Sequence, residues 1–188
     1  MPDEYTEDAA MGPLARVFAI FHSPVRVYAD IERGIPWWEP WAAVSLLNMV
    51  IAYVVIPINA RLFSLNPHGL SPEELSRGME TMQKFYMKYL GVITAPLSVL
   101  FGALVFSGVS YVVVSVLSDR PDFKKHFTIY LYCSVVVSVG VLVSNLIVRW
   151  HGVENIRNVG DAVAPLGPAA LFSPDAKIWF AFASTLDV

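Results

Sequence analysis

The sequence predicts an all-α protein: a polytopic membrane helical bundle with three transmembrane helices and further amphipathic helices at the membrane interface. The main observation is a pair of blocks, residues 89–118 and 127–148, that contain no Asp, Glu, Lys or Arg. Each block is longer than the about 20 apolar residues with which an α-helix crosses the hydrocarbon core. The charged connector between them, residues 119–126, is too short to recross a membrane. The two blocks are therefore expected to form an antiparallel hairpin.

The composition agrees with a membrane protein and limits its function. Hydrophobic residues make up 55% of the chain and charged residues 15%, whereas an ordinary soluble domain has about 25% charged residues. The mean hydropathy is +0.53. Because the net charge is −3 and the basic residues form no cluster, we expect no nucleic-acid partner. The single cysteine, Cys133, excludes an internal disulfide and a cysteine-based zinc cluster.

The chain before the first span predicts a short tail and two helices. Residues 1–13 are expected to form an acidic disordered tail, and residues 14–188 a single membrane domain whose first part, residues 14–34, lies at the interface. The first helix is indicated by apolar residues at amphipathic spacing: Leu14, Val17, Phe18 and Phe21. The second is expected to begin at a cap and a first-turn proline, Ser23 and Pro24, and to point three side chains inward: Val27, Tyr28 and Ile31.

Three arginines lie beside these apolar faces: Arg16, Arg26 and Arg33. Cationic side chains next to an apolar face are typical of helices that lie in the headgroup plane of a membrane. The interpretation we favour is therefore an interfacial location for residues 14–34. The alternative is that both helices simply pack on the spans.

The first span is expected over about residues 40–60, which are uncharged. Trp37, Trp38 and Trp41 directly precede or open this block, and such a density of tryptophan marks a membrane surface. Asn48 and Pro57 are the irregularities of this span. We interpret Asn48 as one interhelical hydrogen bond, worth about 0.6–2 kcal/mol, rather than as part of a transport pathway.

An amphipathic helix is predicted over residues 72–95. Ser71, Pro72 and Glu74 form the pattern of a capping box with a first-turn proline at its start. A straight helix from here to the end of the next span would be about twice the hydrocarbon thickness. We therefore expect Pro96 to end or kink this helix and to open the second span, residues 96–118.

Small residues at four-residue spacing predict close packing of the second span with the third, which covers residues 127–148. The pairs are Ser98 with Gly102, Ala103 with Ser107, Ser134 with Ser138, and Gly140 with Ser144. Beyond the third span, prolines interrupt the apolar residues. The tail, residues 150–188, is therefore expected to be irregular or to form short helices.

Several segments resemble the Yip-domain family, multi-span membrane proteins named for interaction with Ypt/Rab GTPases, and in particular its bacterial branch. The resemblance covers the chain from about residue 14 to its end. Its segments are FHSPVRVYADI at 21–31, PWWEP at 36–40, Pro96 at the start of a span, DFKK at 122–125, YLYC at 130–133 and STLD at 184–187. The polar and aromatic positions of these segments form a candidate interaction surface: Ser23, Pro24, Arg26, Asp30, Trp37, Trp38, Pro40, Asp122, Phe123 and Lys124.

The resemblance implies a protein that lacks the last two of the five spans usual in the family, because the segment similar to residues 184–187 normally precedes a fourth span. It implies a role in membrane trafficking or shaping for eukaryotic members, and for a bacterial-type sequence a place in the inner membrane. The absence of an export signal favours a cytoplasmic N-terminus. We expect the incomplete bundle to associate with itself or with a membrane-protein partner.

No catalytic pattern is present in the sequence. The histidines, His22, His68, His126 and His151, lie in separate segments without metal-ligand spacing, and we expect neither a metal nor a cofactor. The spans carry no ionisable group of the kind that marks a proton or ion pathway. We therefore expect a non-enzymatic membrane scaffold or organiser that acts through lipid and protein contacts. The alternative is a subunit of a transporter whose pathway a partner completes.

Overall fold

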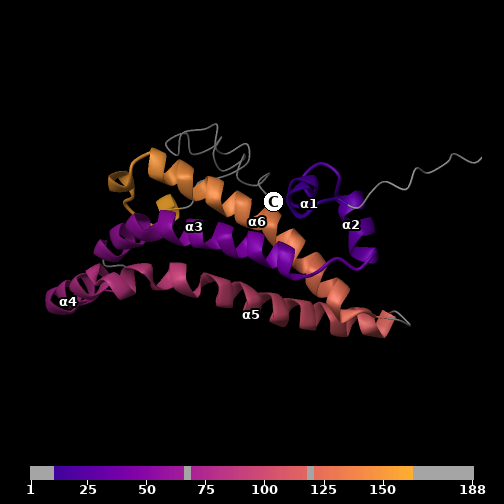
Figure 1. Ribbon diagram of the computed structural model, residues 1–188. Helices are drawn as coiled ribbons and strands as arrows, with labels where there is room; N and C mark the ends of the chain where they lie inside the picture. The colour runs from indigo at the N-terminus through magenta and orange to yellow at the C-terminus, as the bar shows by residue number, and fades with distance from the viewer. Residues whose placement is uncertain (1–10, 66–68, 118–120, 163–188) are drawn as a thin grey trace, which may run out of the picture. The chain divides into compact units, whose positions relative to one another are not determined.

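The computed structural model describes residues 11–65, 69–117 and 121–162, and these residues fold entirely into helices and connecting segments (Figure 1). Within this part of the chain no β-strand is present, which confirms the predicted all-α class. The elements are α1 (Pro13–Ala19), α2 (Pro24–Glu32), α3 (Trp38–Ser64), α4 (Pro72–Gln83), α5 (Phe85–Leu117) and α6 (Phe123–Trp150), followed by the 3₁₀ turns η1 (Val153–Asn155) and η2 (Val159–Ala162).

Three of these helices are long and apolar enough to cross a membrane. They are α3, the part of α5 that runs from Tyr89 to Leu117, and α6, and each reaches a mean hydropathy above 2. This finding confirms the three predicted spans by length and composition. Uncharged sequence of this length is stable in lipid only as a helix, because the helix satisfies every backbone polar group internally.

The described residues form two compact units. One combines residues up to 45 with residues 97–136, and the other combines residues 46–96 with those from 137 onward. The first unit therefore contains α1, α2, the start of α3, most of the second span and the start of α6. The second contains α4 and the remaining parts of the three long helices.

In the first unit, α1 and α2 pack on the start of α6 (Figure 1). The buried cluster consists of Ala19 from α1, Val27 and Ile31 from α2, and Tyr132 from α6. The inward orientation predicted for Val27 and Ile31 is therefore correct, whereas Tyr28, predicted to point inward with them, is 42% exposed. Burial of these side chains fixes the two short helices on the span, since helices of this length are not stable alone.

The contact of α5 with α6 in this unit contains one of the predicted small pairs. Ala103 and Ser107 are both 1% exposed, and Ala103 packs with Phe127 and Leu131. The pair that precedes it does not make such a contact. Ser98 is exposed, and a Cβ atom added to Gly102 would have no heavy atom within 4 Å. The prediction of close packing was wrong for these two residues, because they lie on a different face of α5.

In the second unit a polar contact joins α3 to α6. The amide nitrogen Nδ2 of Asn48 donates a hydrogen bond of 3.0 Å to the hydroxyl of Ser138. This confirms the interhelical hydrogen bond predicted for Asn48. Of the other small residues predicted in α6, Gly140 and Ser144 are half-buried in this unit, and Ser134 is half-buried in the first.

The end of α3 holds the segment that follows α6. Arg61 Nε donates a hydrogen bond of 3.1 Å to the backbone carbonyl of Ile156, and Nη2 one of 3.4 Å to that of Glu154. Ile156 itself packs with Ile58 and Val148. The described part of the predicted tail thus consists of 3₁₀ turns bound to α3, and residues 163–188 lie outside the described residues.

The prediction that the helix ends at Pro96 was wrong, and the alternative of a kink at Pro96 stays a prediction. The capping box at Ser71 and Glu74 is present as predicted, but α4 ends at Gln83, where Lys84 has an extended backbone with φ −61° and ψ 136°. Helix α5 then continues through Pro96. The break falls where the polar sequence meets the apolar block, and a proline inside a membrane helix is tolerated because neighbouring groups and local adjustments satisfy the freed carbonyl.

Substitution of Asn48 by alanine is expected to lower the free energy of unfolding in detergent micelles by about 0.6–2 kcal/mol, the range for an interhelical hydrogen bond in a membrane protein. A double-mutant cycle with Ser138→Ala measures the coupling. Asn145→Ala is the matched control, since the Asn145 amide bonds only to the Val141 carbonyl of its own helix. Equal losses for Asn48→Ala alone and in the Ser138→Ala background would contradict the contact.

Candidate functional site

A buried charge cluster lies between the N-terminal helices and the start of α3. Arg16 of α1 places its Nε atom 3.0 Å from Oδ2 of Asp30 in α2. Its Nη1 atom forms an ion pair with Glu39 in the first turn of α3. The three side chains are only 8%, 4% and 8% exposed. We refer to Arg16, Asp30 and Glu39 as the charge cluster.

The charge cluster holds one cation and two carboxylates, and a second cation, Arg33, balances the remaining negative charge. Arg33, a half-exposed side chain at the rim, places Nη1 3.3 Å from the second oxygen of Asp30. The backbone N–H of Met11 donates a further hydrogen bond of 3.1 Å to Asp30. Two cations therefore face two carboxylates. Such pairing is required because an unpaired buried charge costs several kcal/mol.

The electrostatic balance favours the charged form of Arg16. Burial lowers the pKa of the guanidinium, but the hydrogen bond to Asp30 and the charge of Glu39 more than reverse that effect, so the pKa is raised above its ordinary value. Tyr132 of α6 also lies beside this guanidinium, although its buried hydroxyl makes no hydrogen bond of normal geometry. These effects keep the Arg16 guanidinium charged where it lies against a membrane-spanning helix.

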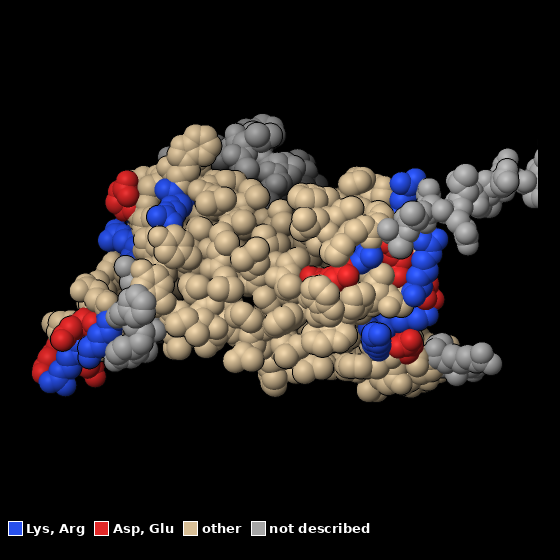
Figure 2. Space-filling model, viewed as in Figure 1, with Lys and Arg blue, Asp and Glu red and all other residues tan. Residues whose placement is uncertain are grey.

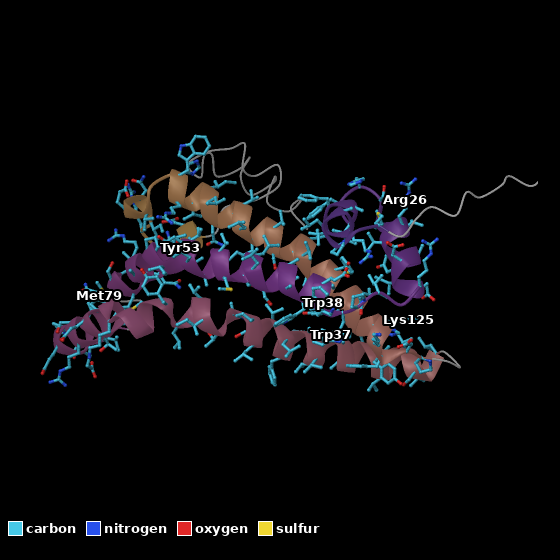
Figure 3. All side chains as sticks on the ribbon, in the orientation of Figure 1. Arg26, Trp37, Trp38, Tyr53, Met79 and Lys125 are labelled. Atoms are coloured by element: carbon cyan, nitrogen blue, oxygen red, sulfur yellow. The ribbon has the colours of Figure 1, made fainter. Side chains whose placement is uncertain are left out.

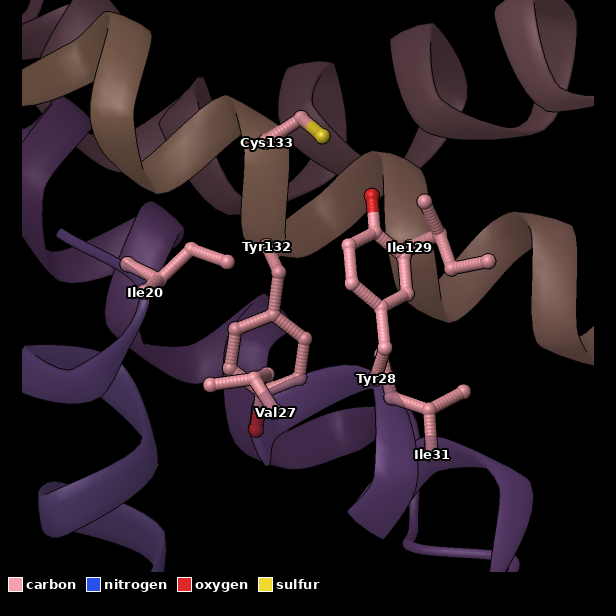
Figure 4. Close-up of a pocket in the computed structure, with 7 residues that line it drawn as sticks. All are labelled: Ile20, Val27, Tyr28, Ile31, Ile129, Tyr132 and Cys133. Atoms are coloured by element: carbon pink, nitrogen blue, oxygen red, sulfur yellow. The ribbon is translucent and has the colours of Figure 1, made fainter. Parts of the chain in front are cut away.

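A shallow apolar recess adjoins the charge cluster (Figure 4). In Figure 4 Tyr132 points from α6 towards α2, and Tyr28 points from α2 towards α6. Burial raises the pKa of the Tyr28 phenol, with a smaller contribution from the neighbouring Cys133. The recess is lined by Ile20, Val27, Tyr28, Ile31, Ile129, Tyr132 and Cys133. Because four of these seven side chains are aliphatic and two more are aromatic rings, the recess offers mainly packing surface.

Aromatic side chains surround the starts of α3 and α6, near the labelled Trp37, Trp38 and Lys125 of Figure 3. The ring of Trp37 lies 5.7 Å from that of Phe127 in an edge-on contact and 6.3 Å from that of Trp41. Aromatic rings at this level of a membrane helix are typical of the boundary between headgroups and acyl chains. Lys125 forms an ion pair with Glu32 and so links α6 to α2 on the exposed side.

The candidate interaction surface is only partly exposed. Pro24, Arg26, Trp38, Asp122 and Lys124 are exposed, Trp37 and Phe123 are about two-fifths exposed, and Ser23 is half-buried. Figure 2 shows the charged side chains of this unit gathered over α1, α2 and the start of α6.

Two members of that surface were predicted wrongly. Asp30 is 3% exposed because it pairs with Arg16, and Pro40 is fully buried at the start of α3. Neither side chain is available to a partner. Both contribute to the interaction surface only by holding the segments that carry it.

Two functional residues of the charge cluster escaped the sequence analysis. Arg16 was expected in the headgroup plane but is turned inward, and Glu39 was assigned no role. The sequence held one signal that these charges are buried. Arg16 is three residues before Ala19, and Asp30 is three residues after Val27, so each charge shares a helix face with a small or apolar residue. That signal alone does not name the partner of the charge.

The helices and the interface that they carry define a multi-pass integral membrane protein. Residues 18–186 match the Yip1 domain, and the chain therefore belongs to the Yip1-domain family. This match confirms the resemblance seen in the short segments of the sequence. Searches of curated proteins and of solved structures gave no match.

Asp30→Asn is expected to loosen α1 and α2 from α6, because it leaves Arg16 with one carboxylate fewer in a buried site. Breaking a buried ion pair costs about 3–5 kcal/mol. Hydrogen exchange of residues 13–32 in micelles should therefore speed up strongly. The control is Glu32→Gln in the same helix, whose exposed pair with Lys125 is worth about 0–1 kcal/mol. If both variants exchange alike, the charge cluster does not hold the helices.

Proposed function

We propose that this protein is a non-enzymatic membrane scaffold or organiser that acts through lipid and protein contacts at the surface formed by α1, α2 and the start of α6. The observation that carries the proposal is the charge cluster. Arg16 pairs with Asp30 and Glu39 and so joins α1, α2 and α3. We therefore assign these side chains a structural role rather than a catalytic one. The surface held in place in this way presents charged and aromatic side chains.

The composition of that surface supports contact with another protein. Arg26 and Lys124 are exposed cations, Asp122 is an exposed anion, and Trp38 is 54% exposed. Tryptophan and arginine are the residues that most often dominate the energy of protein interfaces. We place this surface on the cytoplasmic side of a bacterial inner membrane, in agreement with the density of basic residues in the segment 119–126 before and at the start of α6.

The proposal is tested by placing a photo-activated cross-linking residue in the full chain in native membranes. At Arg26 or Lys124 we expect discrete adducts with one or a few membrane proteins or with a second copy. At Phe101, which is 71% exposed on the second span, we expect lipid adducts instead. Asp30→Asn should abolish the discrete adducts while leaving those of Phe101. Adducts that are absent or identical at all three positions would contradict a scaffold surface.

A transporter subunit is the second candidate, because the charge cluster lies against Tyr132 of a membrane span. Ionisable groups at membrane depth are a frequent mark of ion pathways. The test is proton flux into proteoliposomes that contain the chain with its cross-linked partners. Flux above that of empty vesicles that falls with Glu39→Gln would support transport. Flux equal to that of empty vesicles would contradict the transporter proposal.

A further inference from the structure

Helix α1 turns its charged residue inward and its large apolar residues outward. Arg16 is the only charged residue between Pro13 and Ala19, and it is 7% exposed. On the other side, Leu14 is 76% and Phe18 68% exposed. Two further apolar side chains after α1 are also exposed, with Phe21 49% and Val25 78% exposed. We refer to Leu14, Phe18, Phe21 and Val25 as the outer apolar face.

This orientation is the reverse of that in a helix that faces water. An amphipathic helix on a soluble protein buries its apolar stripe and leaves its charges in solvent. Here the pairing of Arg16 with Asp30 and Glu39 makes the inner side polar. The outward side of α1 then carries no polar side chain at all. Such a surface is favourable in contact with acyl chains, where an apolar side chain needs no partner.

The position of α1 along α6 agrees with contact to acyl chains. Ala19 packs on Tyr132, which lies nine residues after Phe123 and so about 13.5 Å along the helix at 1.5 Å per residue. Helix α6 has 28 residues and a length of about 42 Å, against a hydrocarbon core of about 30 Å. About 6 Å at each end of a centred helix therefore lies outside the core. Tyr132, and with it α1, falls several ångströms below the core boundary.

The neighbouring surface of α6 has the same chemistry. Cys133, directly after Tyr132, is exposed, and Val136 one turn further along the helix is 41% exposed. In a membrane span these side chains face lipid. Exposed apolar side chains therefore lie both on α1 and on the part of α6 that follows Tyr132.

We infer that α1 and the start of α2 are inserted in one leaflet of the bilayer, with acyl chains as the occupant of the outer apolar face. This inference rests on the proposed function and names the lipid half of its contacts. The exposed Arg26 lies next to Val25, and its long side chain reaches from this depth to the headgroups. The charge cluster is the polar inner side of the inserted helices and is shielded from lipid by them.

The test is the depth of a fluorescent label in the full chain. In a Cys133→Ser background, Phe18→Cys carries an environment-sensitive dye, and the protein is reconstituted in phosphatidylcholine and phosphatidylglycerol vesicles. Phe101→Cys in the second span and Asp122→Cys in the exposed connector are the deep and the aqueous controls. We expect the Phe18 label to shift its emission to shorter wavelength, to resist iodide, and to be quenched most by nitroxides on the upper acyl chain.

Two results would overturn the inference. Iodide quenching as strong as at Asp122 would show that the face lies in water, and protection from all quenchers together with cross-linking between labelled copies would show that a second chain covers it. Leu14→Cys provides an independent second position if Phe18→Cys does not reconstitute. The scaffold proposal depends on adducts at Arg26 and Lys124, so it fails or stands separately from this result.

Discussion

The arrangement of the N-terminal part of the protein depends on one constraint, which is that the charge of Arg16 is buried and must be paired. Its two partners come from two other elements, since Asp30 is in α2 and Glu39 opens α3. Satisfying one guanidinium therefore fixes three segments of the chain at once. Apolar packing on Tyr132 alone would hold α1 and α2 near α6 but would leave their rotation and register less defined.

The same constraint determines which surfaces remain for partners. Asp30 and Arg16 are paired with each other and buried. Charged side chains that stay exposed in this unit include Arg26 and Lys124. The polar and the apolar parts of the surface are thus separated. In the proposed scaffold, the exposed cations and tryptophan would contact proteins or headgroups, and the outer apolar face would contact acyl chains.

The sequence predicted the parts of the fold that depend on local chemistry. Uncharged blocks predicted the spans, the serine and glutamate at 71 and 74 predicted a capped helix, and Asn48 predicted a hydrogen bond between helices. It failed where the outcome depends on distant groups. The helix continues through Pro96 because its surroundings tolerate the missing donor, and the inward turn of Arg16 depends on carboxylates 14 and 23 residues away. No periodicity encodes such partners, so an arginine beside an apolar face was assigned to the headgroups.

The charge cluster also explains how a helix as apolar as α1 acquires a defined orientation. Without Arg16, its sequence from Pro13 to Ala19 has no polar side chain, and hydrophobic burial against the span would favour the rotation that buries the large side chains Leu14 and Phe18 rather than Ala19. The hydrophobic effect has no direction, whereas an ion pair with two fixed carboxylates has one. One buried arginine therefore selects the rotation in which Ala19 contacts the span and Leu14 and Phe18 point away from it. In this protein the apolar residues provide the apolar surface, and the ion pairs of Arg16 determine that it faces outward.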